Sequence, residues 1–384
     1  MSKKEWSALL LILVILISLA VFLFRVKKEM VDFRVNYEAG KRMRAGETLY
    51  RVEDGHYQFK YPPFSSFLYL PLSLLPLDMA EAVWYGIVLA SSFLIFYLSF
   101  KLVPQEFGAS PWLKVLPPLV LARYFLRELQ LGQINALMTC LLLLVACLLV
   151  CEERSRSKGQ GILAGVLWGL ASGLKPYALI YFPYLILKKK WGILSSGFLF
   201  LGLAFVLPAA FYGWKGNLEV HREWLSSFSH STPGLLGSQD NISLIGLLMK
   251  WSGSLRTTVG LYLLLVIFIA IGLFFIVRKG KSVTDPQVLD FSLILMAIPL
   301  VSPLGWDYTL LSTAPALVLI INSIHRYPKF WRVFLGINLA IISFSIFDLL
   351  GRQVYSRFMS WSVITLSFLI LAGYVAYLRI KNCR

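Results

Sequence analysis

The feature that most constrains this chain is a series of apolar blocks, most of them long enough to cross a lipid bilayer as a helix, which takes about 20 apolar residues. We expect about twelve transmembrane helices, at residues 7–25, 80–102, 112–127, 132–151, 160–173, 175–187, 192–212, 255–278, 288–302, 308–325, 330–349 and 360–378. The blocks at 160–173 and 175–187 are short for full crossings and also fit one broken helix. The expected fold class is therefore all-α, a polytopic integral membrane protein.

Composition supports this class and excludes a water-soluble enzyme. The 384 residues are 58% hydrophobic and only 15% charged, whereas a soluble domain carries about 25% charged residues. The 37 Lys and Arg exceed the 20 Asp and Glu and give a net charge of +17. In a soluble protein this excess would suggest nucleic-acid binding. Here basic loops beside a bilayer explain it, so we expect the lipid bilayer as a partner and no nucleic acid.

The first apolar block has the basic flank of a signal sequence, Lys3-Lys4, but runs into Arg25 and Lys27 without a small-residue cleavage site. We interpret it as a retained signal anchor.

The cysteines do not suggest a disulfide framework, and the histidines do not suggest a metal site. The cysteines (140, 147, 151 and 383) lie on one apolar block and at the tail, and the histidines (56, 221, 230 and 325) lack ligand spacing. We expect unpaired cysteines, no metal and no cofactor.

The short basic connections fix the expected topology. Basic clusters occur at 154–158, 188–190, 278–281, 326–332 and 379–384. With a cytoplasmic N-terminus, all of them lie on the cytoplasmic side, as the positive-inside rule requires. Segment 26–79 is also rich in basic residues, so only the short connections discriminate. We expect both termini in the cytoplasm, outer loops at 26–79 and 213–254, and a single domain over 1–384, since no internal repeat or linker is evident.

Under this topology an acidic residue lies at the start of the first outer loop. Asp32 follows the first apolar block. A carboxylate at a membrane interface can act as a general base if it reaches a hydroxyl proton. It can equally cap the next helix or pair with Arg34.

Three cations also lie at expected outer helix ends. Arg123 and Arg127 are four residues apart and so project from one side of a helix, while Lys175 precedes Pro176, which interrupts its helix. Together they can hold a phosphate. The alternative is that each extends toward lipid head groups.

Two amides and a proline pair complete the outer polar set. Gln133 and Asn135 begin the fourth block and either bind sugar hydroxyls or join helices. Tyr61-Pro62-Pro63 cannot belong to a continuous helix, because proline removes a donor and restrains its predecessor. We interpret it as a rigid turn that can also shape the wall of a site.

These residues belong to an ordered set of motifs: Asp32-Phe33, Gly46 with Leu49-Tyr50, Tyr61-Pro62-Pro63, Pro71-Leu72 with Leu75-Pro76, Gly132-Gln133-x-Asn135, Leu174-Lys175-Pro176, Asn241-x-Ser243 and Ser302-Pro303-x-x-Trp306-Asp307. In this order they resemble glycosyltransferase family 87, over about residues 30–325. That family belongs to the C-type, multi-spanning, polyprenyl-phosphate-sugar-dependent superfamily.

The resemblance implies an outward-facing active site in a prokaryotic cell membrane. It also implies a donor such as polyprenyl-phosphate-mannose, and transfer of the hexose to a hydroxyl of a glycolipid or glycan. The base of such enzymes, an Asp in the first outer loop, corresponds to Asp32. We expect the donor phosphate to contact Lys175, Arg127, Arg123 and Tyr308, and the sugar or acceptor to contact Tyr61, Gln133, Asn135, Asn241 and Asp307.

One position departs from the family pattern. Family members often carry His after the Trp-Asp pair, whereas here Tyr308 follows Asp307. Any role of that His passes to Tyr308 or Lys175.

A transporter or flippase for lipid-linked sugars or other anionic amphiphiles is the alternative function. Polar groups gathered at one face and the absence of evident repeats favour an enzyme over a transporter.

The topology is directly testable by cysteine labelling. In a background with the four native cysteines replaced by serine, a cysteine at position 54 should react with a membrane-impermeant reagent in intact cells, and one at position 189 should not. Labelling at position 189 would overturn the topology and the outer site with it.

Overall fold

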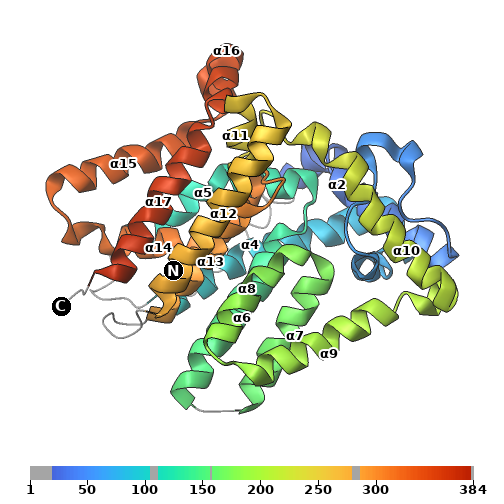
Figure 1. The fold of residues 1–384 in the computed structure, drawn as a ribbon. Coiled ribbons are helices and arrows are strands. Elements are labelled where there is room, and N and C mark those ends of the chain that lie inside the picture. The colour runs from blue at the N-terminus through green and yellow to red at the C-terminus, as the bar shows by residue number, and fades with distance from the viewer. Residues whose placement is uncertain (1–19, 104–110, 156–157, 279–285, 382–384) are drawn as a thin grey trace, which may run out of the picture.

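The structure, a computed structural model, describes residues 20–103, 111–155, 158–278 and 286–381. In these ranges the regular elements are all helices, apart from an isolated β-bridge between Asn241 and Trp306 (Figure 1). The α-helices are α2 (Val31–Ala45), α3 (Ser66–Tyr69), α4 (Leu77–Leu102), α5 (Pro111–Leu131), α6 (Asn135–Ser155), α7 (Lys158–Leu174), α8 (Tyr181–Leu187), α9 (Trp191–Val206), α10 (Ala209–Ser231), α11 (Leu244–Ser252), α12 (Leu255–Arg278), α13 (Pro286–Val301), α14 (Ala314–Ser323), α15 (Lys329–Phe344), α16 (Phe347–Ser360) and α17 (Val363–Ile380). The 3₁₀ helices are η1 (Val26–Lys28), η2 (Val52–Tyr57), η3 (Pro63–Ser65), η4 (Leu72–Leu74), η5 (Pro176–Ile180), η6 (Pro233–Leu235), η7 (Asp307–Thr313) and η8 (Ile324–Arg326).

The all-helical prediction is confirmed for these residues, but the count of about twelve transmembrane helices is not. Four described helices are long and apolar enough to cross a membrane: α4, α12, α17 and the section Asn135–Glu152 of α6. The number rises to six if each of two bent pairs counts as one span. Most of the first expected helix, 7–25, lies outside the described residues.

Bends and breaks explain the difference. The pair α9 and α10 bends by 92° and the pair α15 and α16 by 101°, so two apolar blocks end earlier than expected. The expected blocks 160–173 and 175–187 are separated at Lys175, which lies at the cavity end, and the chain returns by Lys188 to the end that carries Glu152 and Asp290. Lys175 is extended, at φ −149° and ψ 111°, and η5 and α8 follow it. Proline disfavours helical conformation at the preceding residue, which ends α7 at Leu174.

The segments expected as outer loops are substantially helical. Segment 26–79 contains the 15-residue helix α2 and a series of short turns. Arg42 on α2 forms a two-pronged ion pair with Asp54 in η2, and Gly46 ends α2 at φ +67°. Segment 213–254 contains most of α10 and the short helix α11, for which Ser243 is the N-cap. Figure 1 shows α10 beside α2 at one edge of the molecule, and α11 next to α12.

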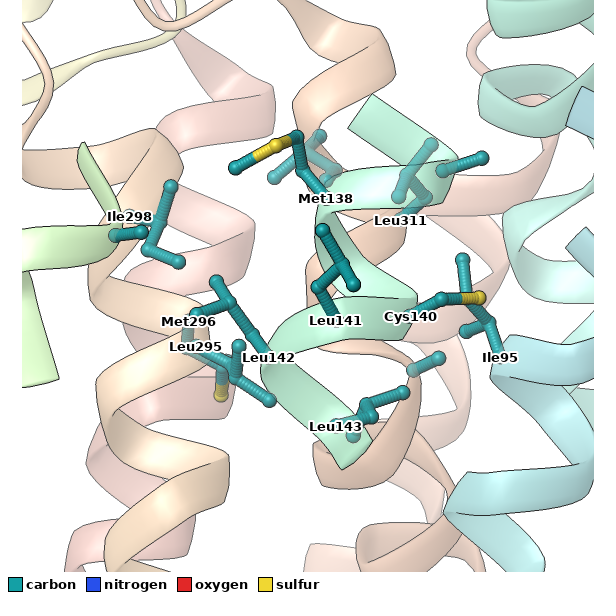
Figure 2. Packing of buried hydrophobic residues seen from close by; sticks show 14 of the residues in the cluster. Ile95, Met138, Cys140, Leu141, Leu142, Leu143, Leu295, Met296, Ile298 and Leu311 are labelled. Atoms are coloured by element: carbon teal, nitrogen blue, oxygen red, sulfur yellow. The ribbon is translucent and has the colours of Figure 1, made fainter. Parts of the chain in front are cut away.

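The helices α4, α7 and α13 and the 3₁₀ helix η7 pack against α6. Figure 2 shows Leu141, Leu142 and Leu143 of α6 among Leu295 of α13 and Leu311 of η7. All five are buried. Within a membrane, lipid tails are as apolar as leucine, so close packing rather than escape from water holds such helices together. The most apolar window of α12, by contrast, is not buried at all within the protein, as expected for a lipid-facing helix.

The two ends of the helix bundle differ in chemistry. At one end, Arg379 of α17 donates to buried Asp290 of α13 at 2.7 Å, and Lys188 lies 3.8 Å from the same carboxylate. Lys190 pairs there with Glu152 at 3.0 Å. This end collects the short basic connections 188–190 and 379–381. The 21 residues of α6 run from it to the other end, a length of about 30 Å.

The opposite end is organised by the turn between α5 and α6. Gly132 has φ +68°, and a Cβ there would lie 2.6 Å from the Cβ of Phe33. Its carbonyl accepts a hydrogen bond from the indole of Trp84 at 2.7 Å. Only glycine fits this conformation and this close approach. The turn therefore fixes the start of α6 against the start of α2.

We expect Gly132→Ala to destabilise the protein by about 1–3 kcal/mol, because alanine meets both the strained backbone conformation and the Phe33 contact. Thermal unfolding of the detergent-solubilised protein, followed by circular dichroism, measures the effect. Gly86→Ala is the matched control, since a Cβ at Gly86 in α4 has nothing within 4 Å. Equal melting temperatures of the two variants would contradict this account of the turn.

Candidate active site

A cavity of about 840 Å³ lies at the end of the bundle where α2, α6 and η7 begin and α7 ends. Six of the residues predicted from the sequence line it: Asp32, Tyr61, Arg127, Gln133, Lys175 and Tyr308. Four others lie behind its wall: Arg123, Asn135, Asn241 and Asp307. Residues more than 270 positions apart in the chain thus reach one polar space.

Asp32 is in the first turn of α2 with its carboxylate toward the cavity. Its Oδ2 accepts a hydrogen bond from Nε2 of Gln133 at 2.6 Å. It does not pair with Arg34, which donates to Glu81 at 2.7 Å. Nor does it cap α2, which begins after Met30. Burial raises the pKa of the Asp32 carboxyl, and this effect exceeds the opposing one of the Gln133 hydrogen bond and the Lys175 charge.

Gln133 is the centre of the polar network. Besides Asp32, its amide nitrogen donates to the hydroxyl of Tyr308 at 3.1 Å. Its amide oxygen accepts from the hydroxyl of Tyr61 at 3.2 Å and from Nδ2 of Asn135 at 3.3 Å. Four side chains, from three helices and the loop at Tyr61, are held by one amide, which fits the interpretation of Gln133 as a residue that joins helices. The same contacts place it on the cavity wall.

Lys175 is held by a second amide. Its Nζ donates to Oδ1 of Asn135 at 2.6 Å and lies 4.9 Å from the ring centre of Tyr61. Asn135 in turn donates to the carboxylate of Glu128 at 3.0 Å. The other Glu128 oxygen accepts from the backbone of Ala136 at 2.7 Å. Glu128 is fully buried and orients the amide that positions the lysine.

The arginines predicted to share a helix face do so. Arg123 and Arg127 of α5 each lie 3.4 Å from the carboxylate of Asp307. Arg123 also donates to the carbonyl of Ser345, and its side chain is largely buried. Arg127 is about half exposed and lines the cavity. Asp307 is therefore placed to hold the arginines.

Asn241 clamps two loops together. It is fully buried, and its side-chain oxygen accepts from the backbone of Gly305 at 3.0 Å and of Ser243 at 3.1 Å. Its nitrogen donates to the carbonyls of Leu236 and Pro303 at 3.0 and 3.1 Å. Asn241 thus fixes the backbone beside Trp306, which lines the cavity.

Several wall residues had not been singled out from the sequence. His56, Tyr57, Gln58 and Lys60 reach the cavity from the loop that precedes Tyr61. Burial lowers the pKa of the Lys60 amine, and Asp32 opposes the effect. In the sequence, the signal that could have identified these four wall residues was their position directly before the Tyr-Pro-Pro motif. Among the described residues, no group of three or more His, Cys, Asp or Glu is arranged to hold a metal ion.

The fold and the site define a helical membrane protein with a carboxylate and a lysine on one polar cavity. The model of glycosyltransferase family 87 matches residues 59–303, more than half of the chain. The chain belongs to this family and is a glycosyltransferase, with a sugar donor and an acceptor as substrates. Comparison with curated proteins and with solved structures gives no match. The resemblance predicted from the motifs is confirmed, and the family favours the enzyme over the transporter.

Proposed function

We propose that the protein transfers a hexose, with mannose as the first candidate, from a polyprenyl-phosphate-linked donor to a hydroxyl of a glycolipid or glycan. The observation that carries the proposal is the pairing of Asp32 and Lys175 on one cavity, joined through Gln133 and Asn135. A base for the acceptor and a cation for the donor phosphate are the two groups that such a transfer requires.

In this proposal each charged group has one task. The lipid phosphate leaves as the acceptor oxygen attacks, so negative charge grows on the phosphate. Lys175 and Arg127 line the cavity and stabilise that charge. Asp32 accepts the hydroxyl proton, and a single displacement inverts the anomeric centre. Tyr308 adds a hydroxyl beside Gln133 in place of the family histidine.

The remaining predicted residues divide by position. Tyr61 and Gln133 line the cavity and are assigned to the sugar or the acceptor. Asn135 acts through Lys175, while Asp307 and Arg123 act through Arg127, because these contacts lie behind the wall. Asn241 keeps the loop around Trp306 in place. This assignment modifies the direct contacts expected for Asn135, Asn241, Asp307 and Arg123.

We also propose that the cavity faces the outside of a prokaryotic cell membrane, with both termini in the cytoplasm and residues 1–384 as one domain. The support is the separation of the two ends of the bundle. The basic residues at 188–190 and 379–381 lie at the end away from Asp32. Short basic connections favour the cytoplasmic side.

Lys175→Ala should weaken binding of polyprenyl phosphate by about tenfold or more, since a hydrogen bond to a charged group contributes roughly 1.5–3 kcal/mol. Titration of the detergent-solubilised protein with the labelled lipid measures this. Lys41→Ala, at an exposed lysine of α2 that does not line the cavity, is the control. Unchanged affinity of a folded Lys175→Ala variant would remove Lys175 from the donor site.

Asp32→Asn should lower turnover at least 10²-fold and up to about 10⁴-fold, because it removes the base and keeps the shape of the side chain. Donor affinity should change little. Transfer from radiolabelled polyprenyl-phosphate-mannose to a membrane glycolipid extract measures turnover. Glu38→Gln is the matched control, since Glu38 is an exposed carboxylate on the same helix. Near-parental transfer by a folded Asp32→Asn variant would exclude Asp32 as the base.

A further inference from the structure

A second carboxylate lines the cavity that contains Asp32. Asp240, in the loop between η6 and α11, is half-buried and forms part of the cavity wall. Among the described residues, its side chain has neither a hydrogen-bond nor an ion-pair partner. Glu128 and Asp307, which lie behind the wall, differ in this respect, because Glu128 is hydrogen-bonded to Asn135 and Asp307 pairs with the arginines. The carboxylate of Asp240 is therefore free to bind substrate.

The backbone on both sides of Asp240 is fixed by one ammonium group. Nζ of Lys250 in α11 donates to the carbonyls of Gln239 and Asn241, both at 2.8 Å, and to the carbonyl of Met359 at 3.2 Å. Because Lys250 already serves three carbonyls, it holds the chain in place and leaves the carboxylate of Asp240 unpaired. A side chain on such a fixed backbone loses little freedom when it binds a ligand.

The register of this loop places Asp240 beside the position proposed for the donor phosphate. Asn241 and Trp306 form an antiparallel bridge, so the adjoining positions, Asp240 and Asp307, are also opposite each other. Asp307 lies 3.4 Å from Arg127, which lines the cavity and is proposed to contact the phosphate. The sugar attached to that phosphate is therefore the part of the donor within reach of Asp240.

The groups around Asp240 indicate a neutral sugar ring. Trp306 is half-buried, lines the same cavity and offers an apolar face. A carboxylate accepts several hydrogen bonds and donates none, so it binds hydroxyls and disfavours an anionic group. The cations Lys60, Arg127 and Lys175 on this cavity disfavour a positively charged ligand. A hexose, which has hydroxyls at its edge and C–H groups on its faces, fits both Asp240 and Trp306.

We propose that Asp240 and Trp306 bind the hexose of the donor, with the carboxylate of Asp240 accepting hydrogen bonds from sugar hydroxyls and the indole of Trp306 contacting a C–H face of the ring. This inference rests on the proposed transfer and adds two residues that recognise the donor sugar rather than its phosphate. A site built to bind a hydroxyl rejects a ligand that lacks it. Asp240 therefore selects for a neutral, hydroxylated donor sugar.

The test compares donors with and without the sugar and needs no turnover. The detergent-solubilised protein is titrated with polyprenyl phosphate, polyprenyl-phosphate-mannose and polyprenyl-phosphate-glucose. In the parent protein at least one of the two sugars should raise affinity about tenfold or more over polyprenyl phosphate, since hydrogen bonds to charged groups are the stronger ones. Asp240→Ala should reduce this gain to about twofold or less and leave affinity for polyprenyl phosphate unchanged.

Two further variants complete the binding experiment. Trp306→Leu should also reduce the gain, because leucine lacks the flat aromatic face. Asp348→Ala, at an exposed carboxylate of α16 outside the cavity, is the matched control and should keep the gain.

The outcomes separate the inference from the proposed function. Equal affinity of the parent for all three lipids, or a gain that survives in a folded Asp240→Ala or Trp306→Leu variant, would overturn the inference. Transfer to the membrane glycolipid extract is measured in parallel. A gain that is lost in Asp240→Ala, without any transfer by the parent, would reject the proposed reaction and retain Asp240 as part of a sugar-binding site. Transfer by the parent with a gain that survives in Asp240→Ala would retain the reaction and reject the inference.

Discussion

A chain of hydrogen bonds along the cavity wall holds the site together. It begins at the Glu128 carboxylate, passes through Asn135 to Lys175, and continues through Gln133 to Asp32. Charged groups at membrane depth are costly unless they are paired or face a polar cavity. The amides of Asn135 and Gln133 meet this requirement, because they link Lys175 to Asp32 by hydrogen bonds without neutralising either charge. A carboxylate and an ammonium group thus remain available to substrate in a space that an ordinary ion pair would close.

The bilayer explains why the rest of the fold supports this network. Since lipid gives the helices no hydrophobic reason to associate, the bundle depends on close packing between helices and on a few polar contacts between them. The same helices carry the Asp290 and Arg379 pair at one end and the cavity at the other. Breaks such as Lys175-Pro176 occur where the chain meets the cavity, so that side chains at helix ends point into it.

The sequence predicted the helical class, the family and the gathering of Asp32, Gln133 and Lys175, because spacing and helix ends limit where those side chains can lie. It also predicted that Arg123 and Arg127 share a helix face, which their common contact with Asp307 confirms. Hydropathy could not predict the number of spans, since the bends after α9 and α15 depend on packing. Nor could it predict that Glu128 orients Asn135 or that Asn241 faces the backbone, because both depend on contacts between distant segments.

The pH dependence of kcat/KM for hexose transfer tests the central claim most directly. The claim is that the half-buried Asp32, in its ionised form, accepts the acceptor proton. Burial raises the pKa of Asp32, so the rate should fall as pH decreases through a value above about 3.9, the ordinary pKa of aspartate. The residual activity of Asp32→Asn should lack this acidic limb. A rate that stays constant as pH falls to about 4, or an acidic limb that persists in Asp32→Asn, would contradict the account.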